Sequence, residues 1–100
     1  MTINRILNGK ELTLAPLGWL DTNSSPKLGS EIEKIEDITL LIFDFAGVEY
    51  ISSAGLRQVA AAGKKTREIG AAFKIINAGT EVMSIFKLTG LDRKFDITGI

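Results

Sequence analysis

The run Ile38-Thr39-Leu40-Leu41-Ile42-Phe43-Asp44-Phe45 is apolar at almost every position rather than at every second one. Continuous apolarity over this length is typical of a strand buried on both faces, the pattern of a parallel sheet covered by helices. We therefore expect an α/β fold in which this strand is central. The segments on either side of it should supply the rest of the sheet and the helices packed against it.

The residues that follow, Val48-Glu49-Tyr50-Ile51-Ser52-Ser53-Ala54-Gly55-Leu56, expose two hydroxyls and then begin an amphipathic segment that predicts a helix. A serine at the first turn of a helix lies beside free backbone N–H groups and the positive end of the helix dipole. It can cap the helix, or it can carry a phosphate, whose two or so negative charges this position tolerates. A serine before a helix is most often only a cap, so these residues alone leave both roles open.

Upstream, residues 3–7 and 11–17 alternate in polarity and are separated by Asn8-Gly9-Lys10. Asn-Gly favours positive φ at both turn positions, which predicts a tight antiparallel hairpin. Pro16 lies late in the second strand and indicates an edge or the end of that strand.

Three helices and two further strands complete the expected order. Ser25 before Pro26 predicts the cap of a first helix, whose apolar face contains Leu28, Ile32 and Ile35. The second helix should begin near Ser53 and end at Gly70, and a third should run from a Thr80 cap to Gly90. The remaining strands are expected at residues 73–77 and, as an edge strand, near residues 95–97. The result is a single domain over residues 1–100, a mixed, mostly parallel sheet with an N-terminal antiparallel hairpin and helices packed against it.

The composition narrows the possible functions. The chain has 100 residues, 45% hydrophobic and 24% charged, with twelve basic and twelve acidic residues that cancel. This balance of charges argues against a nucleic acid or a membrane surface as the partner, and it favours a protein or a small ligand. Residues 1–5 open no signal peptide, and no apolar run approaches the roughly 18 residues that a membrane span needs. A cytoplasmic domain is the default expectation.

The sequence gives little support for an enzymatic function. The chain has no cysteine and no histidine, which removes thiol chemistry, the usual general base and the commonest metal ligands. Asp21, Asp44 and Glu49 show no spacing that specifies a catalytic carboxylate pair, and Ser52 and Ser53 have no histidine to activate them. No P-loop pattern is present. We expect no catalytic activity, no metal and no cofactor.

Five stretches give the chain a resemblance to STAS-domain anti-sigma factor antagonists, running nearly from end to end: Gly18-Trp19-Leu20-Asp21, Leu41-Ile42-Phe43-Asp44, Val48-Glu49-Tyr50-Ile51-Ser52-Ser53-Ala54-Gly55-Leu56-Arg57, Ile76-Asn77 and Leu88-Thr89-Gly90-Leu91. The strongest is similar to the family's strand-to-helix junction, where the pattern is Asp-Ser-Ser/Ala-Gly-Leu and the serine after the Asp is phosphorylated. Aligning that pattern on Gly55 and Leu56 makes Ser53 the phosphoacceptor. Ser52 stands where many members have Asp, and it is the alternative acceptor.

The resemblance implies partner switching. The unphosphorylated protein would bind an anti-sigma factor with serine-kinase activity and so release a sigma factor. The kinase, with its own ATP and Mg²⁺, would then phosphorylate Ser53, and a PP2C-type serine phosphatase would reverse the modification. The chain itself is expected to be a monomer or a weak dimer. The implied contact surface comprises seven residues: Asp21, Thr22, Ser24, Ser52, Ser53, Gly55 and Leu56.

Other interpretations of single residues and of the whole chain also exist. Asp21 is equally well interpreted as a contact residue or as a loop or helix-entry cap. Trp19 is more often a partly buried anchor beside a loop than a binding aromatic, and Tyr50 is either an exposed apolar contact or packing under the loop. STAS domains also serve as unphosphorylated scaffold subunits, for example in lipid-transport complexes, or as domains of anion transporters, and the transporter version lacks a membrane segment in this chain. A small-ligand or nucleotide binder rests only on helix N-termini that suit phosphate.

Overall fold

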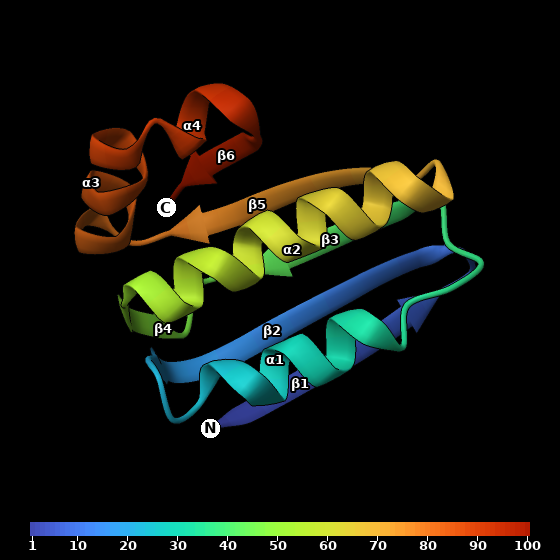
Figure 1. Ribbon diagram of the computed structural model, residues 1–100, viewed down its shortest axis with the longest axis horizontal. Coiled ribbons are helices and arrows are strands. Elements are labelled where there is room, and N and C mark those ends of the chain that lie inside the picture. The colour runs from blue at the N-terminus through green and yellow to red at the C-terminus, as the bar shows by residue number, and fades with distance from the viewer.

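A six-stranded mixed sheet and four helices make up the protein, and the computed structural model describes all of residues 1–100 (Figure 1). The elements follow one another in this order: β1 (Thr2–Asn8), β2 (Glu11–Leu20), α1 (Ser25–Glu33), β3 (Leu40–Asp44), β4 (Val48–Ile51), α2 (Ser53–Ile69), β5 (Ala72–Ala78), α3 (Thr80–Thr89), α4 (Leu91–Lys94) and β6 (Asp96–Gly99). The predicted α/β class, the N-terminal hairpin and the helix–strand alternation are confirmed. The strand β4 and the short helix α4 were not predicted.

The sheet is organised around β2, which has two different neighbours on its inner side. The strands lie in the order β1-β2-β3-β5-β6, with β1 antiparallel to β2 and the other pairs parallel. The first half of β2 pairs with β3, whereas its last residues, from Gly18 to Leu20, pair with β4. Figure 1 shows α1 and α2 side by side across one face of this sheet.

Pro16 lies within β2 rather than at its end. The two-residue turn makes Asn8 and Glu11 a hydrogen-bonded pair, and such pairs alternate along an antiparallel ladder. The pair of Ile3 and Pro16 therefore falls among the non-hydrogen-bonded ones, so the missing N–H points away from β1. On that side β3 has already ended and β4 has not begun, which is why an interior proline costs no ladder bond here.

The central run is covered by helices on one face only. Leu41 and Phe43 are fully buried, but Ile42 between them is only half-buried, and it shares its face with Thr13 and Lys74 through the strand register. The expectation of a strand buried on both faces was therefore wrong for β3. Apolar residues on the helix-free face are shielded partly by their neighbours within the sheet rather than by a second layer.

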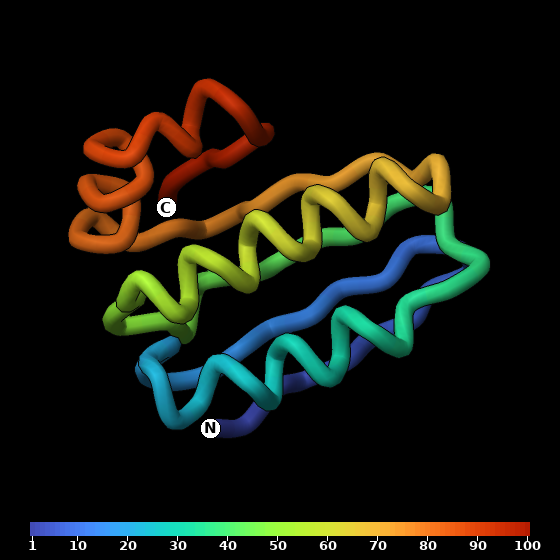
Figure 2. Tube along the Cα trace, viewed as in Figure 1, coloured from blue at the N-terminus to red at the C-terminus, as the bar shows by residue number.

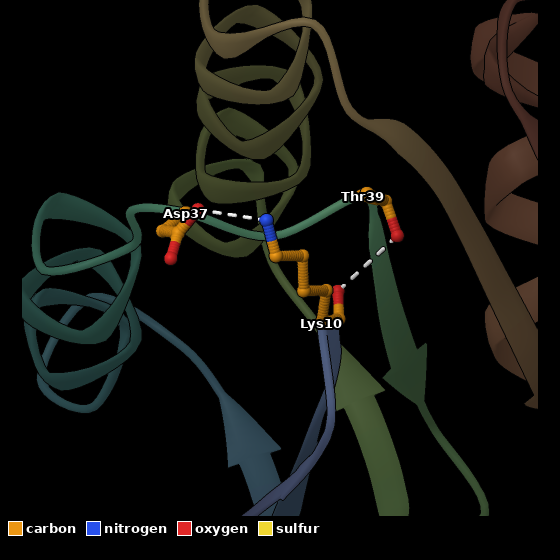
Figure 3. Close-up of polar contacts among 3 residues, drawn as sticks. All are labelled: Lys10, Asp37 and Thr39. Atoms are coloured by element: carbon orange, nitrogen blue, oxygen red, sulfur yellow. Dashed lines mark hydrogen bonds and ion pairs between the residues drawn. The ribbon is translucent and has the colours of Figure 1, made fainter.

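The hairpin turn is formed by Gly9 and Lys10, with positive φ only at Gly9 (+64°). Glycine at the first central position matches a type II′ turn, rather than the turn with two positive φ values expected from Asn-Gly. Lys10 then anchors the connection from α1 to β3, because its carbonyl accepts from the N–H of Thr39 at 2.8 Å. Figure 3 shows the side-chain contacts: Lys10 Nζ lies 3.2 Å from Asp37, and the Lys10 carbonyl accepts from Thr39 Oγ1 at the long distance of 3.5 Å. The ion pair is exposed and contributes little, so the backbone bond is the more important tie.

Two helix starts differ by one residue from the prediction. The N-cap of α1 is Ser24, with Ser25 buried at the first helical position, and the N-cap of α3 is Gly79 rather than Thr80. The predicted helix ends are confirmed, because Gly70 and Gly90 adopt the left-handed conformation that closes a helix, with φ of +75° and +78°.

The strand ends opposite the hairpin turn are tied together by polar contacts. The carboxylate of Asp44 accepts from Asn77 Nδ2 and from the N–H of Ala46, each at 3.1 Å. Figure 2 shows the chain trace, in which the two termini lie at opposite edges of the sheet, one beside β1 and the other beside β6. None of the helices is both long and apolar enough to cross a lipid bilayer.

Candidate functional site

The strand register brings the two predicted site segments to the same place. Leu20 and Ile51 are the last paired residues of β2 and β4. Because these strands are parallel, the next residues, Asp21 and Ser52, leave the sheet side by side. The loop into α1 and the N-terminus of α2 thus lie next to each other, the arrangement that the family resemblance implied.

Ser52 is the N-cap of α2 and is fully engaged in that role. Its backbone is extended (φ −95°, ψ 178°), and its Oγ accepts from the N–H of Gly55 at the long distance of 3.5 Å. Its N–H and its Oγ both donate to the carbonyl of Leu20, at 2.9 and 3.2 Å. The hydroxyl of Ser52 therefore holds the helix start against the end of β2.

Ser53 is the first residue of α2 and has the opposite character. It is exposed, and its hydroxyl makes no hydrogen bond within the chain. The N–H groups of Ser53 and Ala54 also have no intramolecular partner, as expected at a helix start. A group attached to the hydroxyl of Ser53 would lie in solvent next to unpaired donors and the positive end of a 17-residue helix.

Gly55 is buried and allows α2 to approach the sheet. A Cβ at this position would lie 2.7 Å from Cγ1 of Ile51 and 2.8 Å from the carbonyl oxygen of Leu20, distances that real Cβ atoms do not show. Gly55 therefore positions the surface from below, while Leu56 is half-buried against the core.

Asp21 caps the loop that leads into α1. Its Oδ1 accepts from the N–H groups of Asn23 and Ser24, both at 3.0 Å, and its carbonyl accepts from the N–H of Ser25 at 2.9 Å. The hydrogen bond from the backbone of Ser24 is the main reason that the pKa of Asp21 is lowered; the Ser24 hydroxyl and the N–H of Asn23 add to the effect. The capping role is thus realised in the structure, and it leaves Oδ2 free for a partner.

The other two loop residues differ in how they are held. Ser24 Oγ accepts from the N–H of Asp21 at 3.0 Å and also contacts the carbonyl oxygen of Trp19. Thr22 is exposed and makes no side-chain hydrogen bond. Trp19, which was expected to be a partly buried anchor, is exposed, and so is Tyr50, whose role the sequence left open. Each lies one residue before the last paired residue of its strand. No sequence signal marks this pair, because it depends on the register of β2 and β4.

The model of the STAS domain family matches residues 3–99, so the chain belongs to the STAS domain family. No curated protein sequence matches the chain significantly.

Solved structures share the fold at low sequence identity. An anti-sigma factor antagonist from Mycobacterium paratuberculosis is 24% identical, with a TM-score of 0.88 over 99% of this chain and 86% of that one. The Bacillus protein SpoIIAA is 15% identical in both forms: unphosphorylated, with a TM-score of 0.81 over 96% of this chain and 87% of that one, and phosphorylated, with 0.67 over 96% and 90%. A sulfate transporter family protein from Wolinella succinogenes is 10% identical, with a TM-score of 0.81 over 93% and 80%. At these identities the likeness shows the fold.

Proposed function

We propose that this chain is an anti-sigma factor antagonist whose partner binding is switched off by phosphorylation of Ser53. In the unphosphorylated form, residues 1–100 would act in the cytoplasm as one STAS domain, a monomer or weak dimer. The domain would bind an anti-sigma factor with serine-kinase activity and so release a sigma factor. A PP2C-type serine phosphatase would restore the unphosphorylated form.

The observation that carries the proposal is the difference between the two neighbouring serines. Ser53 offers an exposed hydroxyl with no competing hydrogen bond, whereas the hydroxyl of Ser52 both donates to Leu20 and caps the helix. This contrast favours Ser53 over Ser52 as the acceptor. It also gives Ser52 a positioning role in place of the family's Asp.

Transfer of a phosphate from ATP to Ser53 needs no catalytic group on this chain. Ser53 Oγ would attack the γ-phosphorus of kinase-bound ATP, so that the Oγ–P bond forms and the bond between phosphorus and the bridging oxygen breaks. ADP would leave, and a base of the kinase would take the hydroxyl proton. The antagonist contributes an accessible nucleophile on a rigid helix start.

The position of Ser53 at the start of α2 also explains how phosphorylation would switch partner binding off. Two added negative charges are tolerated by this chain because they lie at the N-terminus of α2. In a dry interface the same charges must be stripped of water, and they would repel the phosphates of the nucleotide bound by the kinase. A loss of about 1 to 3 kcal/mol would weaken binding roughly tenfold to a hundredfold.

The proposed interface comprises two segments: Asp21, Thr22 and Ser24 from the loop after β2, and Ser52, Ser53, Gly55 and Leu56 from the start of α2. Of these, Gly55 would act through the position of the backbone, because it is buried.

The test is phosphate transfer. The purified chain is incubated with an anti-sigma factor kinase of the same genome and Mg-ATP, and the modified residue is mapped by mass spectrometry. We expect one phosphate on Ser53 and none on a Ser53→Ala variant. If none of the anti-sigma factor kinases of that genome phosphorylates Ser53, the alternative function is supported, in which the chain is an unphosphorylated STAS scaffold subunit.

A further inference from the structure

Trp19 and Tyr50 form an exposed aromatic pair beside the proposed switch. They are partners in the register of β2 and β4, their ring centroids are 5.2 Å apart and their planes are inclined by 46°. Their side chains are 58% and 41% exposed, and Leu17, two residues before Trp19, is 43% exposed. We call Leu17, Trp19 and Tyr50 the aromatic patch. Contiguous exposed apolar surface of this kind often marks an interaction site.

A β-bulge places Tyr50 in this patch. Between Gly18 and Trp19 the strand β2 advances one residue, while β4 advances two, from Val48 to Tyr50, so Glu49 is the extra residue. Strict alternation would put Tyr50 on the same face as Val48, inside the core. The bulge instead buries both Val48 and Ile51 and turns Tyr50 outward beside Trp19.

A glycine in the turn before β4 accommodates the third member of the patch. A Cβ on Gly47 would lie 2.2 Å from Cδ2 of Leu17, so the side chain of Leu17 lies over this position. The N–H of Gly18 also donates to the carbonyl of Gly47 at 2.8 Å. The backbone of β2 and of the turn before β4 thus fixes where the side chain of Leu17 lies.

We infer that the aromatic patch is the apolar anchor of the interface with the switch partner, an inference that rests on the proposed function. The patch is continuous with the proposed site, because Trp19 precedes Asp21 by two residues and Tyr50 precedes Ser53 by three. Trp and Tyr are the residue types most enriched among those that dominate binding energy. The rigid pair would add apolar contact that phosphorylation of Ser53 does not alter chemically.

The surrounding charge specifies the kind of surface that the partner offers. Residues 11–26 and 35–56 contain no Lys or Arg, whereas Asp21 and Glu49 flank the patch. A shallow depression of about 410 Å³ lies between Leu17, Trp19 and Asp21, and Met1, whose carbonyl accepts from Lys27 Nζ at 2.7 Å, also lines it. A Lys or Arg side chain of the partner would pack its stem on the indole while its charge meets the carboxylate of Asp21. The partner surface is thus apolar at its centre and basic at its rim.

Trp19 is the single tryptophan of the chain, which makes the test direct. The chain is labelled with 5-fluorotryptophan and titrated with the purified anti-sigma factor kinase in the absence of ATP, and the ¹⁹F resonance is followed. We expect the resonance to shift as the complex forms, and Trp19→Ala and Tyr50→Ala to weaken binding at least about tenfold. Ile6→Ala is the matched control, because Ile6 is 60% exposed on the same helix-free face and should bind as the wild type does.

The outcomes separate the patch from the switch. An unmoved resonance and unchanged affinities, with binding still blocked by Ser53→Asp, would overturn the patch and leave the proposed function standing. Weak binding by Trp19→Ala together with normal binding by Ser53→Asp would support the patch and contradict the switch. A resonance that shifts with the concentration of the chain alone would assign the patch to a second copy and overturn the inference. Circular dichroism of each variant confirms that it is folded, and the fluorine label needs no substitution.

Discussion

The carbonyl oxygen of Leu20 accepts two hydrogen bonds from Ser52, one from its N–H at 2.9 Å and one from its Oγ at 3.2 Å. This contact joins the end of β2 to the start of α2, so the loop carrying Asp21 and the helix start carrying Ser53 are held as one surface. The geometry of the site depends on that junction, and substitutions at Ser52 and Gly55 should weaken it.

Replacing Ser52 with alanine removes the N-cap and one of the bonds to Leu20. We expect a loss of about 0.5 to 2 kcal/mol in the free energy of unfolding, measured by chemical denaturation. Thr80→Ala is the control and should change stability little, because the hydroxyl of Thr80 makes no capping bond. The folded Ser52→Ala variant should still be phosphorylated on Ser53. Loss of the phosphate in this variant, together with a phosphate on Ser52 in Ser53→Ala, would identify Ser52 as the acceptor.

A methyl group at Gly55 has no room beside Leu20 and Ile51. Gly55→Ala should therefore destabilise the protein by about 1 to 3 kcal/mol, or roughly 4 to 8 °C in Tm for each kcal/mol. Gly29→Ala is a matched comparison within α1, since its Cβ would also meet an atom at 2.8 Å, but that atom ends the flexible side chain of Gln58. There the gain in helix propensity should win, by up to about 1 kcal/mol. Equal effects of the two substitutions would contradict the assigned packing role.

A negative charge on Ser53 should leave the fold intact. At the first turn of α2 an added charge is expected to be neutral or to stabilise by about 0.3 to 1 kcal/mol. Ser53→Asp can be compared in thermal denaturation with Ser30→Asp, which adds the same charge to an exposed position in the second half of α1. Only Ser30→Asp should lower stability. A Ser53→Asp variant that unfolds more easily than the wild type would mean that any loss of partner binding reflects damage to the fold.

Asp21 should titrate below its ordinary value. Bonds from Ser24 and Asn23 lower its pKa, so the ionised carboxylate stabilises the fold at pH above about 3.9, the value in an unfolded chain. This contribution is lost as pH falls through the lower folded pKa. Carboxyl NMR of Asp21 should give a midpoint below 3.9, and the stability difference between wild type and Asp21→Asn should shrink on acidification. A midpoint at or above 3.9 would show that the loop bonds do not persist in solution.

Sequence patterns predicted the sheet class and the hairpin because each of them leaves a signal over several residues. They predicted the ends of α2 and α3 because Gly70 and Gly90 adopt the left-handed conformation that closes a helix. They did not predict β4, because a four-residue strand containing a bulge gives no alternation to detect. The contrast between Ser52 and Ser53 was also beyond the sequence, since it depends on the carbonyl of Leu20, a residue 32 positions away. The exposure of Tyr50 beside Trp19 depends on the same bulge, so the sequence did not predict it either.

The most direct test of the switch compares the affinity of one partner for the two forms of this protein. The anti-sigma factor kinase is titrated by calorimetry, in the absence of ATP, with the unphosphorylated chain and with the chain carrying phosphoserine at position 53. We predict that phosphorylation weakens binding at least about tenfold, equivalent to about 1.4 kcal/mol. Equal affinity for the two forms would contradict the switch.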